Sequence, residues 1–349
     1  MNRLPCKSFI SRRVFTSSLV LGITAPDLCA LPQPETKKIS LAVGGKAALY
    51  YLPLTISEQL GYFKAENLDV EISDFSDGPQ ALQALVKGSV DVCSGAFEHT
   101  INLQSKNQTY QAFVLQGRAP QIAFGISIKT LPHYKSIADL KGKKIGVSAP
   151  GALTNMMANL VLSGGGLKAS DVTFIEVGTS AGALTALRSG EIDAISNIDP
   201  IMTMLEQKGE IKIISDTRTL KGTLEIFGGP MPAACLYAPL EFIRKHPNTC
   251  QALAYGIVRG LKWLQTAGPG DIIKAVPESY FLGDRALYLA SFNKIRESIS
   301  LDGIFPDDGP MTALKALVSL DSNIRPDRID LAKTFTNEFA QRAKERFKA

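Results

Sequence analysis

Two short loops carry the polar side chains that are best placed to bind a small molecule. Residues 94–98 and 196–200 occur in two similar parts of the chain, and each follows a stretch of apolar residues that is typical of a strand. If these strands belong to facing lobes, the loops approach the same cleft. The candidate binding residues of the two loops are Gly95, Phe97, Glu98, Asn197 and Asp199. Phe97 packs either on an apolar part of the ligand or in the core, and the carboxylates favour a ligand with an amine or several hydroxyls.

Two basic residues favour the opposite ligand charge. Lys46 lies in a loop after a predicted strand, beside Ala47 and close to Tyr50, where it could contact an anion or face solvent. Arg118 follows another apolar strand, and a guanidinium binds a carboxylate or sulfonate through two parallel hydrogen bonds. A structural ion pair is the alternative for Arg118. A zwitterion such as taurine would use both signs of charge.

A third candidate loop precedes a predicted helix at 156–162. Residues 148–154 include Gly151 and Thr154, and the N–H groups at the start of a helix suit an anion. Thr154 could instead cap the helix. The sequence therefore predicts Gly151 and Thr154 as ligand-binding residues, with capping as the alternative.

Catalytic and cofactor motifs are missing from the sequence. His99, His133 and His246 are not spaced as metal ligands, and no G-x-S-x-G or H-E-x-x-H motif occurs. The glycines at 164–166 lack the G-x-G-x-x-G spacing of a nucleotide site. We therefore predict a protein that is not an enzyme, with no catalytic residue, no metal and no cofactor.

The N-terminus predicts export. Residues 11–15 resemble a twin-arginine signal, followed by a short apolar region and a cleavage position after Ala30; an ordinary Sec signal is the alternative. Both place the mature protein in the periplasm. Cleavage leaves three cysteines, Cys93, Cys235 and Cys250. Because this number is odd, at least one thiol is free, and a disulfide between Cys235 and Cys250 is possible.

Charge and hydrophobicity exclude other classes of protein. The net charge is +5, of which the predicted leader contributes +3, so little basic surface remains for nucleic acid. No later stretch has the roughly 18 uninterrupted apolar residues of a membrane span.

A repeat organises the elements that position these loops. Residues 81–93 and 183–195, 102 positions apart, match in sequence, and each predicts a helix, a glycine in the left-handed conformation and a short strand. The glycines are Gly88 and Gly190. Asp91 and Asp193 recur within the repeat for structural reasons. Two α/β lobes with right-handed crossovers and mostly parallel sheets follow from this pattern.

The remaining elements follow from apolar runs and turn residues. Expected strands lie at 39–43, 70–72, 113–115, 122–128, 144–147 and 172–177; expected helices lie at 53–60 and 156–162, and the chain from 239 onward is mainly helical.

Residues 57–71, SEQLGYFKAENLDVE, resemble the E-x-x-G-Y/F-F-x-x-x-G/N-L-x-V-E run of ABC-importer substrate-binding proteins of the nitrate, sulfonate and taurine type. Residues 78–80 with the first repeat, and then 137–147, match the same family in the same order. The family is related to proteins that bind the pyrimidine precursor of thiamine. The resemblance implies a type II periplasmic binding protein fold, an α/β fold of two lobes joined by a hinge of two crossovers. Lobe one would comprise 38–124 and 231–349, and lobe two 125–230.

The resemblance also implies a function. A monomer would capture a small organic anion, such as a sulfonate, taurine or nitrate, in the cleft and deliver it to the transmembrane subunits of an ABC permease. The alternatives are a thiamine pyrimidine precursor or other heterocycle as ligand, a ligand-sensing subunit without its own permease, and a pyrimidine-synthase-like enzyme on the same fold.

Overall fold

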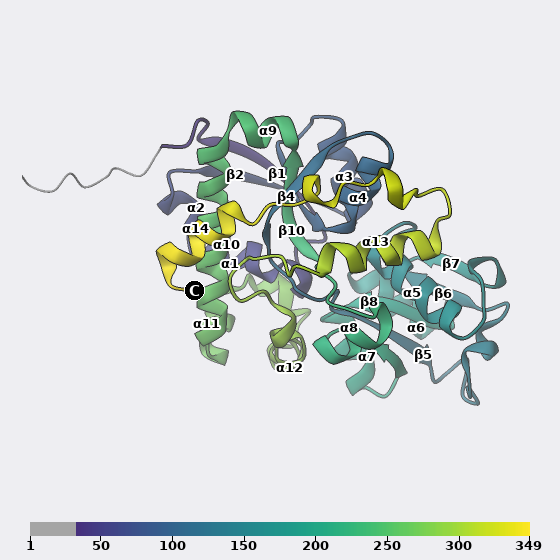
Figure 1. Cartoon of the computed structure of the whole chain (residues 1–349). Coiled ribbons are helices and arrows are strands. Elements are labelled where there is room, and N and C mark those ends of the chain that lie inside the picture. Colours follow the sequence, from purple (N-terminus) through teal and green to yellow (C-terminus); the bar gives the residue numbers. More distant parts are fainter. Residues whose placement is uncertain (1–32) are drawn as a thin grey trace, which may run out of the picture. The chain divides into compact units, whose positions relative to one another are not determined.

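Two five-stranded sheets organise residues 33–349, the part of the chain that this computed structural model describes (Figure 1). The predicted export leader at 1–30 lies outside the described residues. Each sheet carries its own helices, and the fold confirms the predicted two-lobed α/β architecture.

The first sheet has the order β2-β1-β3-β10-β4. Strand β1 runs parallel to β2 and β3, whereas β10 runs antiparallel to both β3 and β4. Its strands are β1 (Lys38–Gly44), β2 (Asp69–Phe75), β3 (Val92–Ala96), β4 (Tyr110–Leu115) and β10 (Ala234–Pro239).

The second sheet repeats this arrangement in the order β7-β6-β8-β5-β9. Strand β6 is parallel to β7 and β8, and β5 is antiparallel to β8 and β9. Its strands are β5 (Ile122–Ser127), β6 (Lys144–Val147), β7 (Thr173–Glu176), β8 (Ala194–Ile198) and β9 (Ile211–Asp216). In each sheet four strands run in one direction, as expected for a mostly parallel sheet, and one strand next to a lobe crossing runs antiparallel to both of its neighbours.

Helices follow the strands in chain order. In the first lobe these are the 3-10 helix η1 (Leu49–Tyr51), α1 (Leu52–Gln59), α2 (Tyr62–Ala65), α3 (Gly78–Val86) and α4 (Glu98–Ser105); in the second they are α5 (Leu153–Gly164), α6 (Ala181–Ser189), α7 (Ile201–Gln207) and α8 (Leu220–Phe227). The C-terminal helices are α9 (Leu240–Lys245), α10 (Pro247–Thr266), α11 (Pro269–Ala275), α12 (Arg285–Ile295), α13 (Gly309–Leu320) and α14 (Glu338–Phe347).

The repeat has the predicted structure. Helices α3 and α6 end just before Gly88 and Gly190, whose φ angles of 72° and 88° are left-handed. Glycine adopts this conformation without the clash that a Cβ causes.

The strands expected to begin at Val90 and Ile192 begin at Val92 and Ala194, and the repeated aspartates lie just before them. Asp91 accepts a hydrogen bond from the backbone N–H of Ser40 at 2.8 Å, and Asp193 accepts one from Lys144 at 3.0 Å. Both carboxylates therefore tie the start of a strand to its neighbour, in agreement with their predicted structural role.

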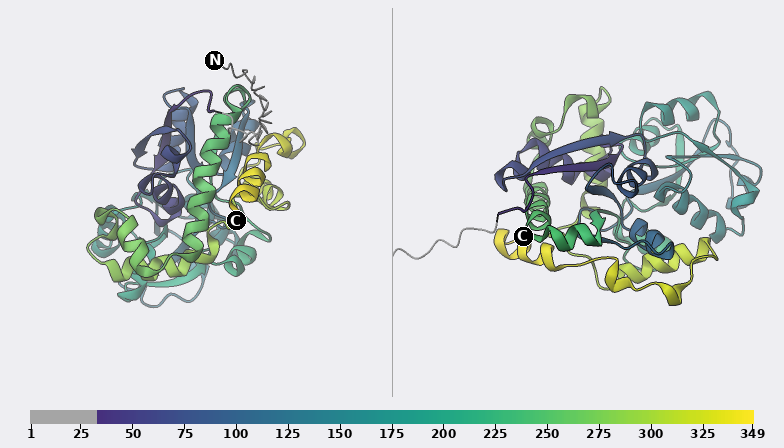
Figure 2. Two further views of the ribbon diagram at one scale, coloured as in Figure 1. Left: turned by 90° about the vertical axis from the view of Figure 1, so that its left-hand side faces the viewer. Right: turned by 90° about the horizontal axis from the view of Figure 1, so that it is seen from above.

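The chain crosses between the lobes twice, at 116–121 after β4 and at 228–233 before β10. After the second crossing, the long green helix α10 runs along the first lobe beside α1, α2 and α14 (Figure 2). Helix α12 instead packs on α7 of the second lobe, where Lys294 pairs with Glu206 at 2.5 Å. Among the helices of residues 33–349, none combines the length and apolar character needed to cross a bilayer.

The three cysteines of the described residues are buried and free. The open possibility of a Cys235–Cys250 disulfide is thus not realised: Cys235 lies in β10, between β3 and β4, and Cys250 lies in α10.

Candidate functional site

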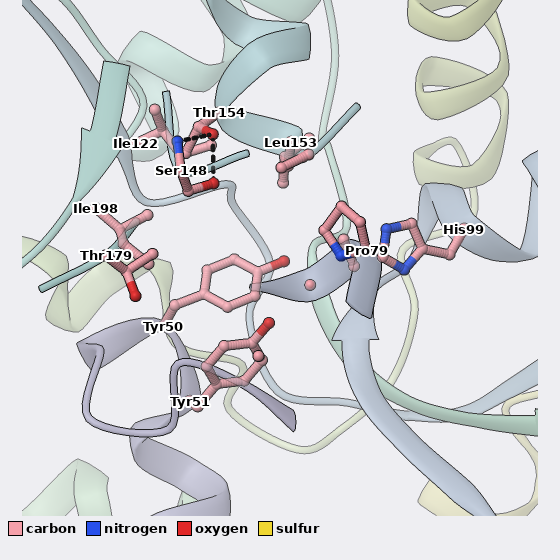
Figure 3. Close-up of a pocket in the computed structure, with 14 residues that line it drawn as sticks. Tyr50, Tyr51, Pro79, His99, Ile122, Ser148, Leu153, Thr154, Thr179 and Ile198 are labelled. Atoms are coloured by element: carbon pink, nitrogen blue, oxygen red, sulfur yellow. Dashed lines mark hydrogen bonds between the residues drawn. The ribbon is translucent and has the colours of Figure 1, made fainter. Parts of the chain in front are cut away.

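A cavity of about 50 Å³ lies between the two lobes, lined by residues from both (Figure 3). It forms at the ends of β1 and β3 and at the starts of α3 and α5, which is where ligands bind in open α/β sheets. Its lining residues are Gly44, Tyr50, Tyr51, Gly78, Pro79, Ala96 and His99 from the first lobe, and Ile122, Ser148, Ala152, Leu153, Thr154, Thr179 and Ile198 from the second.

No Asp, Glu, Lys or Arg side chain is among the described residues that line this cavity. Its side-chain polar groups are the hydroxyls of two tyrosines, one serine and two threonines, together with one imidazole. Hydroxyls both donate and accept hydrogen bonds, so the cavity can bind a polar group of either sign without a neutralising ion pair.

Tyr50 provides the clearest ligand-binding group. Its side chain is buried, with 4% exposed, and its hydroxyl has no hydrogen-bond partner within residues 33–349. Figure 3 shows the ring among residues of both lobes, with the hydroxyl directed into the cavity. Burial raises the pKa of this phenol well above its ordinary value, so it stays protonated. Buried hydroxyls normally have a partner, and a ligand atom would supply one.

His99 contributes a neutral imidazole. Burial lowers its pKa to about 4, so the ring is uncharged at neutral pH. The Tyr237 hydroxyl lies 2.9 Å from Nδ1 and fixes the ring. Gly95 provides the space for this contact, because a Cβ there would lie 3.0 Å from the Tyr237 hydroxyl oxygen.

The start of α5 forms the facing wall. The N–H of Ser148 donates to Oγ1 of Thr154 at 3.0 Å, and the two side-chain hydroxyls lie 2.6 Å apart (Figure 3). The N-cap residue Ala152 makes no side-chain capping bond, so the Thr154 hydroxyl binds the preceding loop rather than capping the helix. The first turn of α5 therefore keeps N–H groups available at the cavity wall.

Of the predicted site residues, the structure brings Tyr50 and Thr154 to this cavity. Lys46 lies outside the lining because its Nζ pairs with the Glu58 carboxylate at 2.5 Å, and its backbone N–H donates to Asp74 at 2.8 Å. Ala47, in the same loop, is not among the lining residues either.

Phe97 and Glu98 lie behind the wall of the first lobe. Phe97 is fully buried against Phe305 and Phe335, with ring centroids 5.3 and 6.3 Å away. Glu98 is 2% exposed, and its Oε2 has no partner in the described part of the chain. Burial raises the pKa of this carboxyl to about 7.

Asp199 lies behind the opposite wall in a buried ionic cluster. Its carboxylate accepts the Thr203 N–H at 2.7 Å and lies 3.5 Å from the Arg218 guanidinium, which also pairs with Glu206 and Asp216. Burial raises the pKa of Asp199, and Arg218 opposes that rise. The carboxylate is thus engaged within the lobe.

The other predicted residues are placed elsewhere. Asn197 donates through Nδ2 to the Gly178 carbonyl at 2.9 Å, and exposed Gly151 donates its N–H to Asn155 at 3.2 Å. Arg118 lines a different pocket, beside the hinge. Contact of these residues with a ligand stays a prediction.

Sequence reasoning missed several lining residues, namely Tyr51, Pro79, His99, Ser148 and Thr179. Pro79 and His99 had a usable signal, because both stand at helix starts that follow parallel strands. Within residues 33–349 no group of three or more His, Cys, Asp or Glu side chains could hold a metal ion.

Comparison with known proteins identifies the family. The family model described as "NMT1/THI5 like" matches residues 49–267. The chain belongs to the NMT1/THI5-like family. The match begins at Leu49, the start of η1, and takes in every lining residue of the cavity except Gly44.

Solved structures and curated relatives agree with this family. A protein of Bordetella bronchiseptica RB50 is 58% identical, covering 91% of this chain and 100% of its own, with a TM-score of 0.89. The alkanesulfonate-binding protein SsuA from Xanthomonas axonopodis pv. citri, solved bound to MOPS, has 17% identity, covers 87% of this chain and 99% of its own, and has a TM-score of 0.69. That likeness shows the periplasmic binding protein fold.

Curated relatives carry two kinds of name. The 4-amino-5-hydroxymethyl-2-methylpyrimidine phosphate synthase of Schizosaccharomyces pombe is 26% identical over 228 residues, 64% of this chain and 64% of its own. Relatives in Bacillus subtilis and Brucella abortus are named as binding proteins, and the alignments span 74% and 45% of their own lengths.

Proposed function

We propose that this protein is the solute-binding component of an ABC importer and that it captures a small organic anion of the sulfonate type between its lobes. The observation that carries the proposal is the buried Tyr50 hydroxyl, which has no hydrogen-bond partner in the described part of the chain and lies in a cavity lined by both lobes. A ligand held by both lobes would couple binding to closure, as a transport receptor requires.

The neutral donors of the cavity suit an anion. The hydroxyls and the start of α5 offer N–H and O–H groups, and helix starts attract negative charge through backbone dipoles. Such a site binds a permanent anion such as a sulfonate without a buried lysine or arginine, whose desolvation would be costly. The alkanesulfonate-binding protein among the structural neighbours supports this ligand class.

Partner and location follow from the same proposal. The protein would be exported to the periplasm, lose its leader and act as a monomer that docks on the transmembrane permease subunits. The fold of the periplasmic binding proteins supports this role, and relatives named as binding proteins favour binding over catalysis.

A heterocycle is the second candidate ligand. Tyr50 and Tyr51 both line the cavity, with ring centroids 4.9 Å apart and an interplanar angle of 83°. Two such rings beside a neutral imidazole could hold a flat pyrimidine, and the synthase-named relative supports that ligand class.

Isothermal titration of the full chain tests both candidates. We expect saturable binding of an alkanesulfonate or taurine, and a Tyr50→Phe substitution should weaken it by about ten- to a hundredfold, since a hydrogen bond to a charged group contributes about 1.5–3 kcal/mol. If the protein binds 4-amino-5-hydroxymethyl-2-methylpyrimidine and no sulfonate, the ligand is the heterocycle rather than the anion. Unchanged sulfonate affinity in Tyr50→Phe would remove this cavity from the proposal.

A further inference from the structure

A second pocket, of about 500 Å³, lies beside the hinge and apart from the inter-lobe cavity. Four parts of the chain form it: Arg118 on the first crossing, Gly229 and Pro230 on the second, helix α8, and the loop at 300–306. Its volume is in the range of about 300–1,000 Å³ that small-molecule sites occupy.

Arg118 is held in place but keeps its charge unpaired. Its backbone N–H donates to the Ser298 carbonyl at 2.8 Å, and its Nε donates to the Glu297 carbonyl at 2.8 Å. Within residues 33–349 its terminal guanidinium nitrogens have no hydrogen-bond partner and no salt bridge. One backbone contact and one guanidinium contact hold Arg118 in place and leave its outer N–H groups directed for a carboxylate or sulfonate.

The nearby acidic groups are engaged elsewhere. One carboxylate oxygen of Glu297 accepts the backbone N–H of Leu220 at 3.0 Å, at the start of α8. Asp302, in the pocket lining, pairs with Lys344 at 2.8 Å and accepts the Ile304 N–H at 3.1 Å. Neither acid forms an ion pair with Arg118, so the guanidinium remains the positive group of the pocket.

The walls around this cation are apolar and exposed. Leu224 of α8 is 57% exposed and Leu301 is 48% exposed, and both line the pocket. Pro230, Ile304 and Pro306 extend the same surface. An apolar surface next to one unpaired cation complements an anion that carries an alkyl tail.

We infer that this hinge pocket binds an amphiphilic anion, whose carboxylate or sulfonate head pairs with Arg118 and whose alkyl tail lies along Leu224 and Leu301. The ligand would touch both lobes. The loop at 300–306 is tied to the first lobe by the hydrogen bond from Leu115 N–H to the Gly303 carbonyl, whereas α8 packs on β9 of the second. Occupancy of this pocket would therefore shift lobe opening, and by linkage the affinity of the inter-lobe cavity.

Titration of the full chain with octanoate and, separately, with octanesulfonate tests the inference. We expect one octanoate to bind per chain, with an affinity at least about tenfold weaker in Arg118→Met, which keeps an unbranched apolar side chain but removes the guanidinium. Leu224→Gln should weaken binding severalfold. Tyr50→Phe, in the other cavity, and Arg244→Met, an exposed arginine in α9, should leave it unchanged.

Three results would overturn the inference. One is an octanoate affinity that Arg118→Met does not change, and another is no binding at millimolar octanoate. The third is loss of octanoate binding in Tyr50→Phe, which would place the fatty anion in the inter-lobe cavity. If only octanesulfonate loses affinity in Tyr50→Phe while octanoate depends on Arg118, both sites stand as separate anion sites.

Discussion

Glu98 shows how burial alone changes a side chain behind the cavity wall. The carboxyl is enclosed, one of its oxygens has no partner among residues 33–349, and its pKa is raised from 4.5 to about 7. The folded protein therefore binds this proton more tightly than the unfolded chain does. The contribution of Glu98 to stability is greatest below pH 4.5 and is lost as the pH rises to about 7.

We expect Glu98→Gln to remove this pH dependence. Relative to wild type, the variant should gain on the order of 3 kcal/mol in free energy of unfolding between pH 4.5 and pH 8. Urea denaturation at a series of pH values measures this difference. His99, with its pKa lowered to about 4, gives the opposite slope between pH 4 and 6.5 in both proteins, so it cancels in the comparison. Parallel pH profiles would show that Glu98 is ionised in the folded state throughout this range.

Individual side chains were the least predictable feature of the site. Tyr50 and Thr154 could be placed from their positions after strands and before a helix. Lys46 could not, because its partner Glu58 approaches only once α1 is formed. Arg118 forms no ion pair within residues 33–349, so the alternative of a structural ion pair is not realised. Its guanidinium faces a different pocket, since its direction is set by the carbonyl of Glu297 far along the chain.

At the scale of elements, the start of α3 holds one wall of the cavity. Asp77 caps the helix through a 2.8 Å bond from the Gln80 N–H and also accepts the Ser76 hydroxyl at 2.8 Å. Gly78 and Pro79, which line the cavity, follow directly.

Replacing Asp77 by Ala should lower the free energy of unfolding by about 1 kcal/mol, the usual loss when an N-cap acceptor is removed. Urea denaturation at neutral pH gives the value. Asp77→Asn keeps an oxygen acceptor and should be close to wild type. Equal losses in both variants would mean that the negative charge, rather than the cap, stabilises this helix.

Most elements could be predicted from the sequence, because apolar spacing and the glycines of the repeat are local signals. Gly88 and Gly190 end their helices as expected. Strand direction was not predictable in the same way. That β5 and β10 each run antiparallel between two neighbours depends on where the chain crosses, which no local pattern encodes.

At the scale of the molecule, two contacts join the lobes next to the cavity. The Leu49 N–H donates to the Asp199 carbonyl at 3.0 Å. At Gly45, where φ is 83°, a Cβ would lie 2.4 Å from the hydroxyl oxygen of Thr179 in the other lobe. This close approach requires glycine on the first lobe.

A Gly45→Ala substitution should therefore hold the lobes further apart. We expect a larger radius of gyration in small-angle X-ray scattering and a ligand affinity reduced by about tenfold or more. Gly142→Ala is the matched control: its φ is 74°, and nothing lies within 4 Å of the added Cβ. Both variants should lose about 1–2 kcal/mol of stability to backbone strain. Identical scattering from the two variants would mean that Thr179 turns aside without moving its lobe.

The position of β10 also sets the order in which the two lobes can be completed. The second sheet has all its strands once residue 216 has been synthesised. The first sheet lacks the strand between β3 and β4 until residue 239, although it begins at residue 38. A chain that emerges N-terminus first can thus complete the sheet of the second lobe before that of the first. Until β10 has been synthesised, the apolar edges of β3 and β4 remain unpaired.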